Sequence, residues 1–340
     1  MRQWAAFCRF GGLNENLHNA RPRRGDPHAV ESQAVLTSTT IAATPRLFLR
    51  TPPRPAHNRY AGLTEPRSRA GGPSSTGGPS TSGGLSSPAG LHRRPWLTRL
   101  RRALQEQLFV LHYQPIMSLR DGSVSHYEAL VRLADDPGGQ LIAPGRFLPA
   151  AERYGLIREI DRMVLAEACA LLAGEHGEHG TRIAINCSSL SITDGGMLAE
   201  IEAQLALARV DPAQLVIEVT ETAAISDMAR AQAFCAGVQA LGCAVALDDF
   251  GAGFGSFQYL KHLPFEYLKI DGDFVRGLPD SPKDQLVVKA LVELARGMGK
   301  QTIAEYVGDA ATVGLLRNIG VDYAQGFQVG RPQPAVPLAV

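Results

Sequence analysis

The chain has 340 residues, 45% of them hydrophobic, and its formal net charge of +1 hides an uneven distribution. Residues 1–95 contain 13 arginines, no lysine and four acidic residues, so they carry about +9 and the remainder about −8. No apolar run approaches the roughly 20 residues that span a bilayer, and the N-terminus lacks the apolar core of a signal peptide. We therefore expect a soluble cytoplasmic protein with no transmembrane segment.

The five cysteines are few and scattered. They form no Cys-x-x-Cys pair: Cys8, Cys169, Cys187, Cys235 and Cys243. An odd, dispersed set fits a reducing compartment better than a disulfide framework, and Cys187 is expected to be core filler.

Residues 1–95 are rich in Pro, Gly, Ser and Arg and show no sustained periodicity. Such a segment buries too little apolar surface to offset its ordering entropy, which predicts disorder. A basic arm that binds nucleic acid or an anionic membrane is the alternative, but aromatic interleaving and an amphipathic face are lacking, so nucleic acid is an unlikely partner. The expected organisation is a disordered segment at 1–95, a folded domain at 97–335 and a tail at 336–340.

The folded part begins with a basic amphipathic pattern that predicts a helix over Leu97–Leu108. Two strand-like runs follow, Phe109–Leu119 and Val124–Leu133. Asp121-Gly122 between them is a strong hairpin signal, so the first two strands should be antiparallel.

Beyond Leu133 the pattern alternates between helix and strand. The expected strands are Arg182–Asn186, Leu215–Val219, the run ending at Asp248-Asp249, Phe265–Ile270, Gln301–Ala304 and Val321–Ala324. The expected helices are Phe147–Tyr154 after a start near Pro144, Ile160–Ala173, Gly196–Ala208, Ser226–Leu241, Ser281-Pro282 to about Met298, and Ala310–Ile319. About 240 residues of this alternation predict an α/β fold, a TIM-like (β/α)8 barrel, with an open doubly wound sheet as the alternative.

The stretch Cys243–Gly255 combines a short apolar run, two adjacent carboxylates and three glycines. Asp248 and Asp249 repel each other unless a cation lies between them, and the glycines allow the backbone to approach a ligand closely. Taken alone, the stretch is equally compatible with a solvated Asp-Asp turn.

Polar residues near the ends of the predicted strands favour a cation site over a solvated turn. In chain order they are Glu128, Asn186, Glu218, Asp248 and Asp249, Lys269, Glu305 and Gln325. In a barrel, the C-terminal ends of the strands meet at one mouth, so five carboxylates would face each other and need cations. Oxygen ligands without His or Cys favour Mg²⁺ or Mn²⁺ over Zn²⁺.

Eight ordered motifs make a family resemblance specific. They are Y-Q-P-I (113–116), E-A-L-V-R (128–132), N-C-S (186–188), E-V-T-E (218–221), D-D-F-G (248–251), Y-L-K-I-D (267–271), A-E (304–305) and Q-G-F (325–327). Over residues 97–335 the chain resembles the EAL domain family of cyclic di-GMP phosphodiesterases. The resemblance implies a barrel with an antiparallel first strand, and hydrolysis of one phosphodiester bond of cyclic di-GMP to linear pGpG in bacterial second-messenger signalling.

The resemblance also implies roles for individual residues. Two ions, Mg²⁺ or Mn²⁺, would be bound by Glu128, Asn186, Glu218, Asp248, Asp249 and Glu305, with Asp248 shared between them. Lys269 would orient the attacking water and Glu305 would assist in its deprotonation, while Glu128 completes the catalytic set. Gln114, Arg132 and Gln325 resemble substrate contacts. Glu221 resembles the residue that holds the loop after the Asp-Asp strand, and Asp271 is either a partner of Lys269 or a loop anchor.

Two departures from the family pattern are visible. Ala252 and Phe254 replace hydroxyl-bearing residues of the loop after Asp249, and Gly308 replaces a glutamate shortly after Glu305. An active phosphodiesterase is the leading hypothesis. A catalytically weak or inactive cyclic di-GMP receptor acting through a protein partner and an interaction scaffold that binds no nucleotide are the alternatives. A homodimer is expected from the resemblance.

Overall fold

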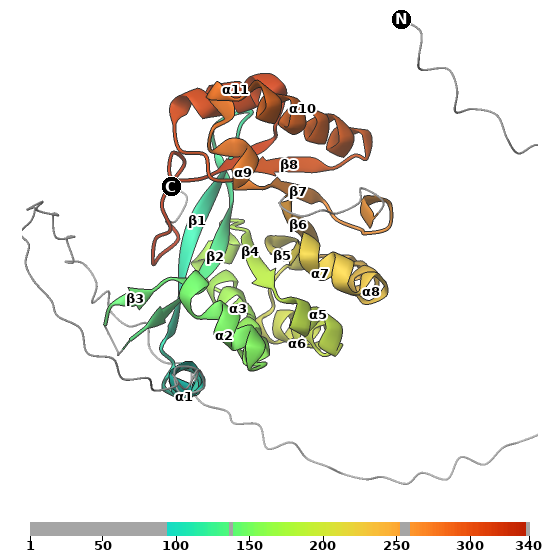
Figure 1. Cartoon of the computed structure of the whole chain (residues 1–340). Helices are drawn as coiled ribbons and strands as arrows, with labels where there is room; N and C mark the ends of the chain where they lie inside the picture. Colours follow the sequence, from blue (N-terminus) through green and yellow to red (C-terminus); the bar gives the residue numbers. More distant parts are fainter. Residues whose placement is uncertain (1–93, 136–138, 252–258, 338–340) are drawn as a thin grey trace, which may run out of the picture. The chain divides into compact units, whose positions relative to one another are not determined.

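A computed structural model describes residues 94–135, 139–251 and 259–337 (Figure 1). The disorder predicted for 1–95 therefore lies outside the described residues, except at positions 94 and 95, where helix α1 (Arg94–Glu106) begins. Ala252, Phe254 and Cys8 also lie outside them. At the other end, Val336 is buried and its carbonyl oxygen lies 3.0 Å from Nε2 of His176.

Eight strands close into a barrel. They are β1 (Phe109–Ser118), β2 (Val124–Ala134), β4 (Ile183–Cys187), β5 (Leu215–Thr220), β6 (Ala244–Phe250), β7 (Tyr267–Ile270), β8 (Gln301–Ala304) and β9 (Tyr323–Gln325). The hydrogen-bonded order β1-β9-β8-β7-β6-β5-β4-β2 is closed by pairing of β1 with β2. β1 runs antiparallel to both neighbours and the other barrel pairs are parallel. The predicted TIM-like barrel with an antiparallel first strand is confirmed, and closure excludes the open sheet.

The hairpin between β1 and β2 forms at the predicted turn. Gly122 has φ 79°, which favours glycine, and its N–H donates to the Ser118 carbonyl at 2.9 Å. The Asp121 carboxylate accepts from the Ser123 N–H at 3.0 Å. The resulting register places Gln114 directly opposite Glu128.

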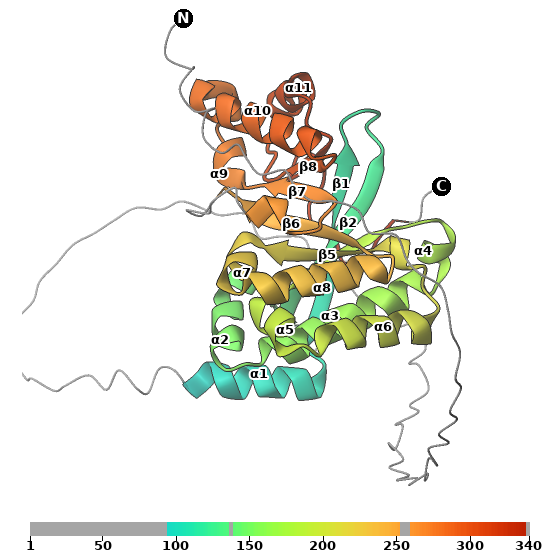
Figure 2. The same ribbon diagram turned by 90° about the vertical axis from the view of Figure 1, so that its right-hand side faces the viewer.

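The predicted helices are present around the outside of the barrel, with ends shifted by a few residues (Figures 1 and 2). They are α2 (Leu148–Arg153), α3 (Ile157–Leu172), α6 (Met197–Ala208), α8 (Met228–Ala240), α10 (Pro282–Gly297) and α11 (Ala310–Ile319). Ser281 caps α10 as predicted, because its Oγ accepts from the Asp284 N–H at 3.3 Å.

The helix start expected near Pro144 is present as a 3₁₀ turn, Pro144–Arg146. The other short elements were not predicted: β3 (Leu141–Ile142), α4 (Glu175–Glu178), α5 (Ser189–Asp194), α7 (Glu221–Ser226), α9 (Gly272–Val275) and the 3₁₀ turns Pro212–Gln214, Tyr259–Lys261 and Leu278–Asp280. Each of α5, α7 and α9 follows a barrel strand closely and is capped by a side chain, from Ser188, Thr220 and Asp271 respectively.

Within the described residues, no helix is both long and apolar enough to cross a bilayer. The four cysteines in this part of the chain are free and buried. Burial raises the pKa of the Cys187 thiol well above its usual value, which suits an unreactive core residue.

The barrel interior is built in two layers that position the site. The lower one, which we call the floor layer, consists of Ile116, His126, Ala184, Val216, Ala246, Tyr267, Ile303 and Tyr323. Side chains two residues apart on a strand point to the same face. The residue two positions from each floor residue, towards the other end of the barrel, therefore also points inward. On every strand this residue is polar, and together these residues form the site layer: Gln114, Glu128, Asn186, Glu218, Asp248, Lys269, Glu305 and Gln325.

Candidate active site

The site layer lies where the barrel strands end, with one exception. The predicted strand Val124–Leu133 is present as β2, which ends at Ala134, but Glu128, expected near the end of this strand, lies in its middle. Its pairing with β4 stops at Ala129, and beyond this residue β2 pairs only with β1 and β3. Glu128 therefore still lies at the rim of the closed barrel, while the β1–β2 hairpin extends past it.

A buried lysine lies at the centre of the layer. The side chain of Lys269 is 1% exposed. Its Nζ lies 2.7 Å from Glu218 Oε2, 2.9 Å from Glu305 Oε1, 3.0 Å from Asp248 Oδ1 and 3.5 Å from Glu128 Oε2. Because one ammonium faces four carboxylates, the cluster has a surplus of negative charge.

The pKa values follow from burial and from this imbalance. Burial would lower the pKa of Lys269, but the carboxylates, Asp248 first among them, raise it well above its usual value. Burial, followed by the charge of Glu128, raises the pKa of Glu218 well above the usual range. Burial raises the pKa of Glu305 to about 8 in spite of the lysine. At neutral pH without other cations, Glu305 therefore keeps its proton in most molecules.

Glu128 behaves differently because amide donors support its charge. Burial alone would raise its pKa, yet Lys269 and the two amides lower it overall. Asn186 Nδ2 donates to Glu128 Oε1 at 2.7 Å, and Gln325 Nε2 donates to Oε2 at 2.6 Å. Gln325 Nε2 also lies 3.3 Å from Gln114 Oε1. Both oxygens of this carboxylate are therefore oriented by side chains of the same layer.

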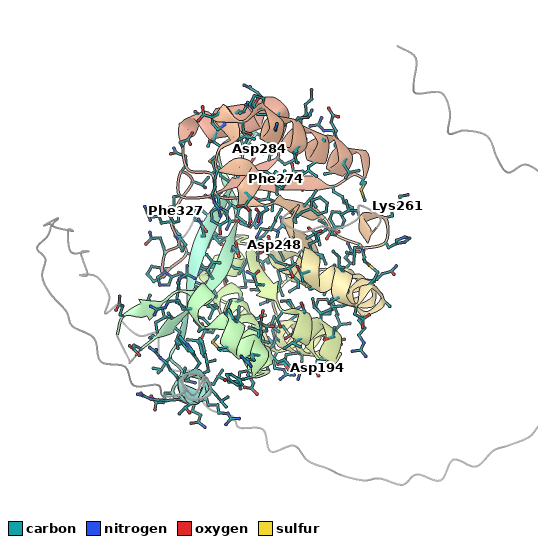
Figure 3. The ribbon with its side chains drawn as sticks, viewed as in Figure 1. Asp194, Asp248, Lys261, Phe274, Asp284 and Phe327 are labelled. Atoms are coloured by element: carbon teal, nitrogen blue, oxygen red, sulfur yellow. The ribbon has the colours of Figure 1, made fainter. Side chains whose placement is uncertain are left out.

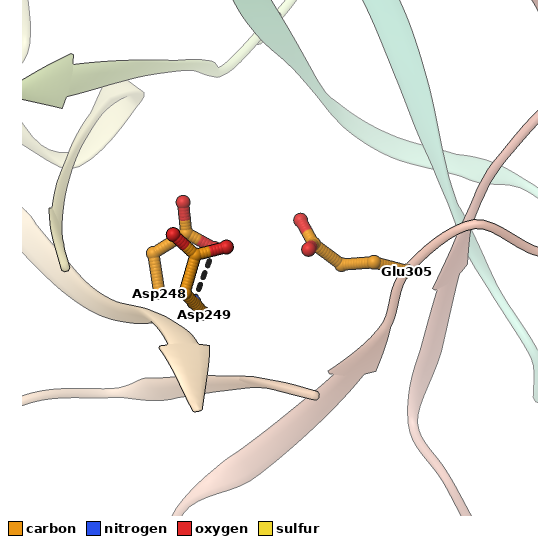
Figure 4. A group of neighbouring side chains, drawn as sticks. All are labelled: Asp248, Asp249 and Glu305. Carbon is orange, nitrogen blue, oxygen red and sulfur yellow. Dashed lines mark hydrogen bonds between the residues drawn. The ribbon is translucent and has the colours of Figure 1, made fainter. Parts of the chain in front are cut away.

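Asp248, Asp249 and Glu305 form a group suited to a cation (Figure 4). One carboxylate oxygen from each lies within 4.8 Å of the others. Asp249 adopts φ 56°, and burial followed by the charge of Asp248 raises the pKa of Asp249 to about 6. Among the described residues, Glu218 Oε1 is buried without a hydrogen-bond partner. An unpaired buried carboxylate oxygen beside an all-oxygen donor set fits a hard divalent cation.

The other predicted contacts surround this centre. Gln114 Nε2 donates to the Gly330 carbonyl at 3.0 Å, so its amide is fixed by the C-terminal segment. Arg132 is half-buried and donates to the carbonyl of Val131 at 3.0 Å. Both residues line the cavity above the carboxylates.

Glu221 and Asp271 support the loops around the mouth. Buried Glu221 accepts from the Gly251 N–H at 3.0 Å, which ties the start of the loop after β6 to α7. Asp271 caps α9 through the Asp273 N–H at 2.7 Å, so its carboxylate serves as a loop anchor.

The cavity above the site has a volume of about 620 Å³. Its lining includes residues that the sequence did not single out: His112, Leu130, Tyr306, Phe327, Arg331 and Pro332. Tyr306 and Phe327 are 56% and 61% exposed, and arginines lie over their rings, Arg276 at 4.1 Å and Arg331 at 4.2 Å. Figure 3 places Asp248 near the centre of the strands and Phe327 at their edge. Because Tyr306 directly follows Glu305, its place in the cavity lining could have been predicted from the sequence.

A second cavity, of about 710 Å³, opens at the opposite end of the barrel. Its charged groups are already engaged: Asp322 accepts from Thr302, and Arg317 donates to the Leu119 carbonyl. It therefore lacks the surplus charge that marks the site layer.

The family model for the EAL domain matches residues 97–332. The chain belongs to the EAL domain family. Its EAL domain is 38% identical over 241 residues to the cyclic di-GMP phosphodiesterase PdeB of Shewanella oneidensis, covering 70% of this chain and 28% of that protein. It is 35% identical over 241 residues to the cyclic di-GMP phosphodiesterase PdeF of Escherichia coli, covering 71% and 32%. The chain thus spans about a third of the length of these curated relatives.

Solved EAL structures show the same fold. The PaMucR phosphodiesterase in its c-di-GMP complex matches with a TM-score of 0.66 at 37% identity, covering 71% of this chain and 98% of that one. The FimX EAL domain from Pseudomonas aeruginosa bound to c-di-GMP matches with a TM-score of 0.67 at 34% identity, covering 72% and 98%.

Proposed function

We propose that this EAL domain hydrolyses one phosphodiester bond of cyclic di-GMP to give linear pGpG, with two divalent ions, Mg²⁺ or Mn²⁺. The observation that carries the proposal is the site layer, in which four carboxylates of the EAL motifs surround the buried Lys269 ammonium. The similarity to proteins named as cyclic di-GMP phosphodiesterases supports the choice of substrate.

The metal ligands we propose are Glu128, Asn186, Glu218, Asp248, Asp249 and Glu305. When bound, a pair of divalent ions would lower the pKa of a shared water and hold the phosphate during in-line displacement. The donor set fits this role because it is all oxygen and its negative charge exceeds what Lys269 offsets.

Protein groups account for the remaining steps. Lys269 offsets negative charge as it grows on the phosphate oxygens and, through its Nζ–H bonds, orients the attacking water. With the proposed cations bound, their charge would favour the ionised form of Glu305, and this carboxylate would take up the proton of that water. The Arg132 guanidinium and the amides of Gln114 and Gln325 bind and orient the dinucleotide, and Glu221 holds the start of the loop that follows Asp249.

A non-catalytic receptor is the second candidate. Gly308 lines the cavity at a position where the family pattern has a glutamate, so one acidic group at the mouth is missing. Such a protein would bind cyclic di-GMP and pass the signal to a protein partner. The expected homodimer and cytoplasmic location stay predictions, and sedimentation of the full chain tests the first.

The deciding experiment follows conversion of cyclic di-GMP to pGpG by the full chain with Mg²⁺ or Mn²⁺. Glu128→Gln keeps the shape of the side chain but removes its charge. We expect turnover to fall by at least a factor on the order of 10–100, which is the usual loss when a group that only supports a metal ligand is removed. Glu202→Gln, at an exposed position of α6, is the matched control.

The outcomes separate the candidates. Turnover by the wild type that is lost in Glu128→Gln supports the phosphodiesterase. Binding without turnover supports the receptor, and the absence of both leaves only the scaffold. Equal turnover by Glu128→Gln and the wild type would contradict the proposed site.

A further inference from the structure

Tyr306 has an unusual backbone conformation for its residue type. It directly follows Glu305 and adopts φ 55°, a left-handed conformation that a bulky side chain rarely takes. Its side chain is 56% exposed and lines the cavity. A strained, exposed aromatic residue beside a site residue motivates a search for a binding role.

Helix α9 holds the ring of Tyr306 from one side. A Cβ atom built on Gly272 would lie 2.1 Å from Tyr306 Cδ2, so the ring rests directly on the glycine backbone. The Arg276 guanidinium lies 4.1 Å from the ring centroid. The Arg276 N–H donates to the Gly272 carbonyl at 2.9 Å, so the two residues are one helical turn apart on the same side of α9.

The guanidinium has a partner of its own, since Arg276 Nη1 donates to Asp273 Oδ1 at 2.7 Å. The ring of Tyr306 thus packs on the Gly272 backbone with a cation over it, while 56% of the side chain stays exposed at the cavity. A flat, preorganised aromatic surface of this kind is what a nucleobase stacks on.

We propose that Tyr306 is a specificity-determining residue that stacks on one guanine base of cyclic di-GMP. The inference rests on the proposed function and extends it to base recognition. The geometry supports it because Glu305, the preceding residue, belongs to the site layer where the phosphate would lie. Because one ribose separates a base from its phosphate, a base would reach Tyr306, which lines the same cavity as Glu305. A purine then gains more from the ring than a smaller pyrimidine does.

The test is a binding titration of the full chain in the presence of Mg²⁺, with Glu128→Gln in every protein to stop turnover. Cyclic di-GMP and cyclic di-UMP are the two probes. Tyr306→Gly should weaken cyclic di-GMP binding by about 5- to 100-fold and cyclic di-UMP binding by clearly less. Tyr306→Phe should bind like the parent, because stacking needs the ring and not the hydroxyl.

A folding control accompanies the titration. Glycine accepts φ 55° without strain, which offsets part of the loss of the ring's contacts with Gly272 and Arg276, and thermal unfolding checks that Tyr306→Gly is folded at the temperature of the titration. Gly272→Ala is a second variant, which displaces the ring while leaving Tyr306 in the chain, and it should also weaken cyclic di-GMP binding.

Three results would overturn the inference. Unchanged cyclic di-GMP binding by Tyr306→Gly removes the stacking role. An equal loss for both probes shows that the residue does not read the base. If cyclic di-GMP binds neither the Glu128→Gln parent nor the wild type, the proposed function is overturned, and the stacking role with it.

Discussion

Removing the Lys269 ammonium should destabilise the protein in a pH-dependent way. Lys269→Met keeps most of the buried volume but leaves Glu218, Glu305, Asp248 and Glu128 facing one another without their common cation. An ion pair at about 3 Å is worth roughly 5 kcal/mol at an effective dielectric constant of about 20, before desolvation. Because breaking a buried pair on one side costs about 3–5 kcal/mol, we expect the free energy of unfolding to fall by that amount at pH 9.

The loss should shrink as the pH is lowered. Without the ammonium, the folded carboxylates hold protons that the unfolded chain releases near pH 4.5, and a protonated carboxyl needs no counter-charge. In the wild type, the pKa of Lys269 lies well above 10.5, so the lysine stays charged throughout this range. The difference between the two proteins therefore grows from about pH 5 to pH 9.

Urea unfolding with a chelator, followed by circular dichroism at several pH values, measures this difference. Lys289→Met replaces an exposed lysine of α10 and should change stability by less than about 0.5 kcal/mol. A loss below about 1 kcal/mol at pH 9, or a loss that does not vary with pH, would refute the view that this ammonium offsets the carboxylates.

Three further predictions concern the same layer and its loop. The chelated wild type should lose stability as the pH rises from about 4.5 to 8, because folded Glu305 keeps its proton up to its pKa of about 8; Glu305→Gln should flatten this slope in a urea series. Glu221→Leu removes the acceptor of the Gly251 N–H, so it should lower the free energy of unfolding by about 1–3 kcal/mol and weaken Mn²⁺ binding measured by calorimetry. Glu221→Gln keeps a carbonyl acceptor and is the control. Equal Mn²⁺ affinity in both variants would contradict the anchoring role. Mn²⁺ at about 100 times its dissociation constant should stabilise the wild type by about 2.7 kcal/mol, and unchanged thermal unfolding would argue against a metal site.

Most of the fold could be predicted from local patterns. Helices α1 and α3 carry clear amphipathic periodicity, Ser281 marks the start of α10, and the Asp121-Gly122 turn sets the direction of the first two strands. The helices α5, α7 and α9 are too short to show periodicity, with four to six residues each. Only their capping residues, such as Thr220, were visible in advance.

The residues of the site could be predicted from the sequence, but the contacts between their side chains could not. Polar residues at strand ends indicated a common mouth, because parallel strands end at the same edge. That Lys269 contacts four carboxylates depends on closure of the barrel across residues far apart in sequence. The left-handed conformations of Asp249 and Tyr306 could not be read from the sequence, since neither residue type favours φ > 0 as glycine does.

The floor layer closes the barrel beneath the site layer. Aliphatic and aromatic side chains, with neutral His126 among them, fill the barrel beneath the carboxylates, and burial lowers the pKa of this histidine to about 3. Water and protons that exchange with Lys269 must therefore pass through the cavity on the other side of the site layer. Under the proposed function, a bound dinucleotide would cover that cavity, so the cations would have to enter before the substrate and could exchange only after the product leaves.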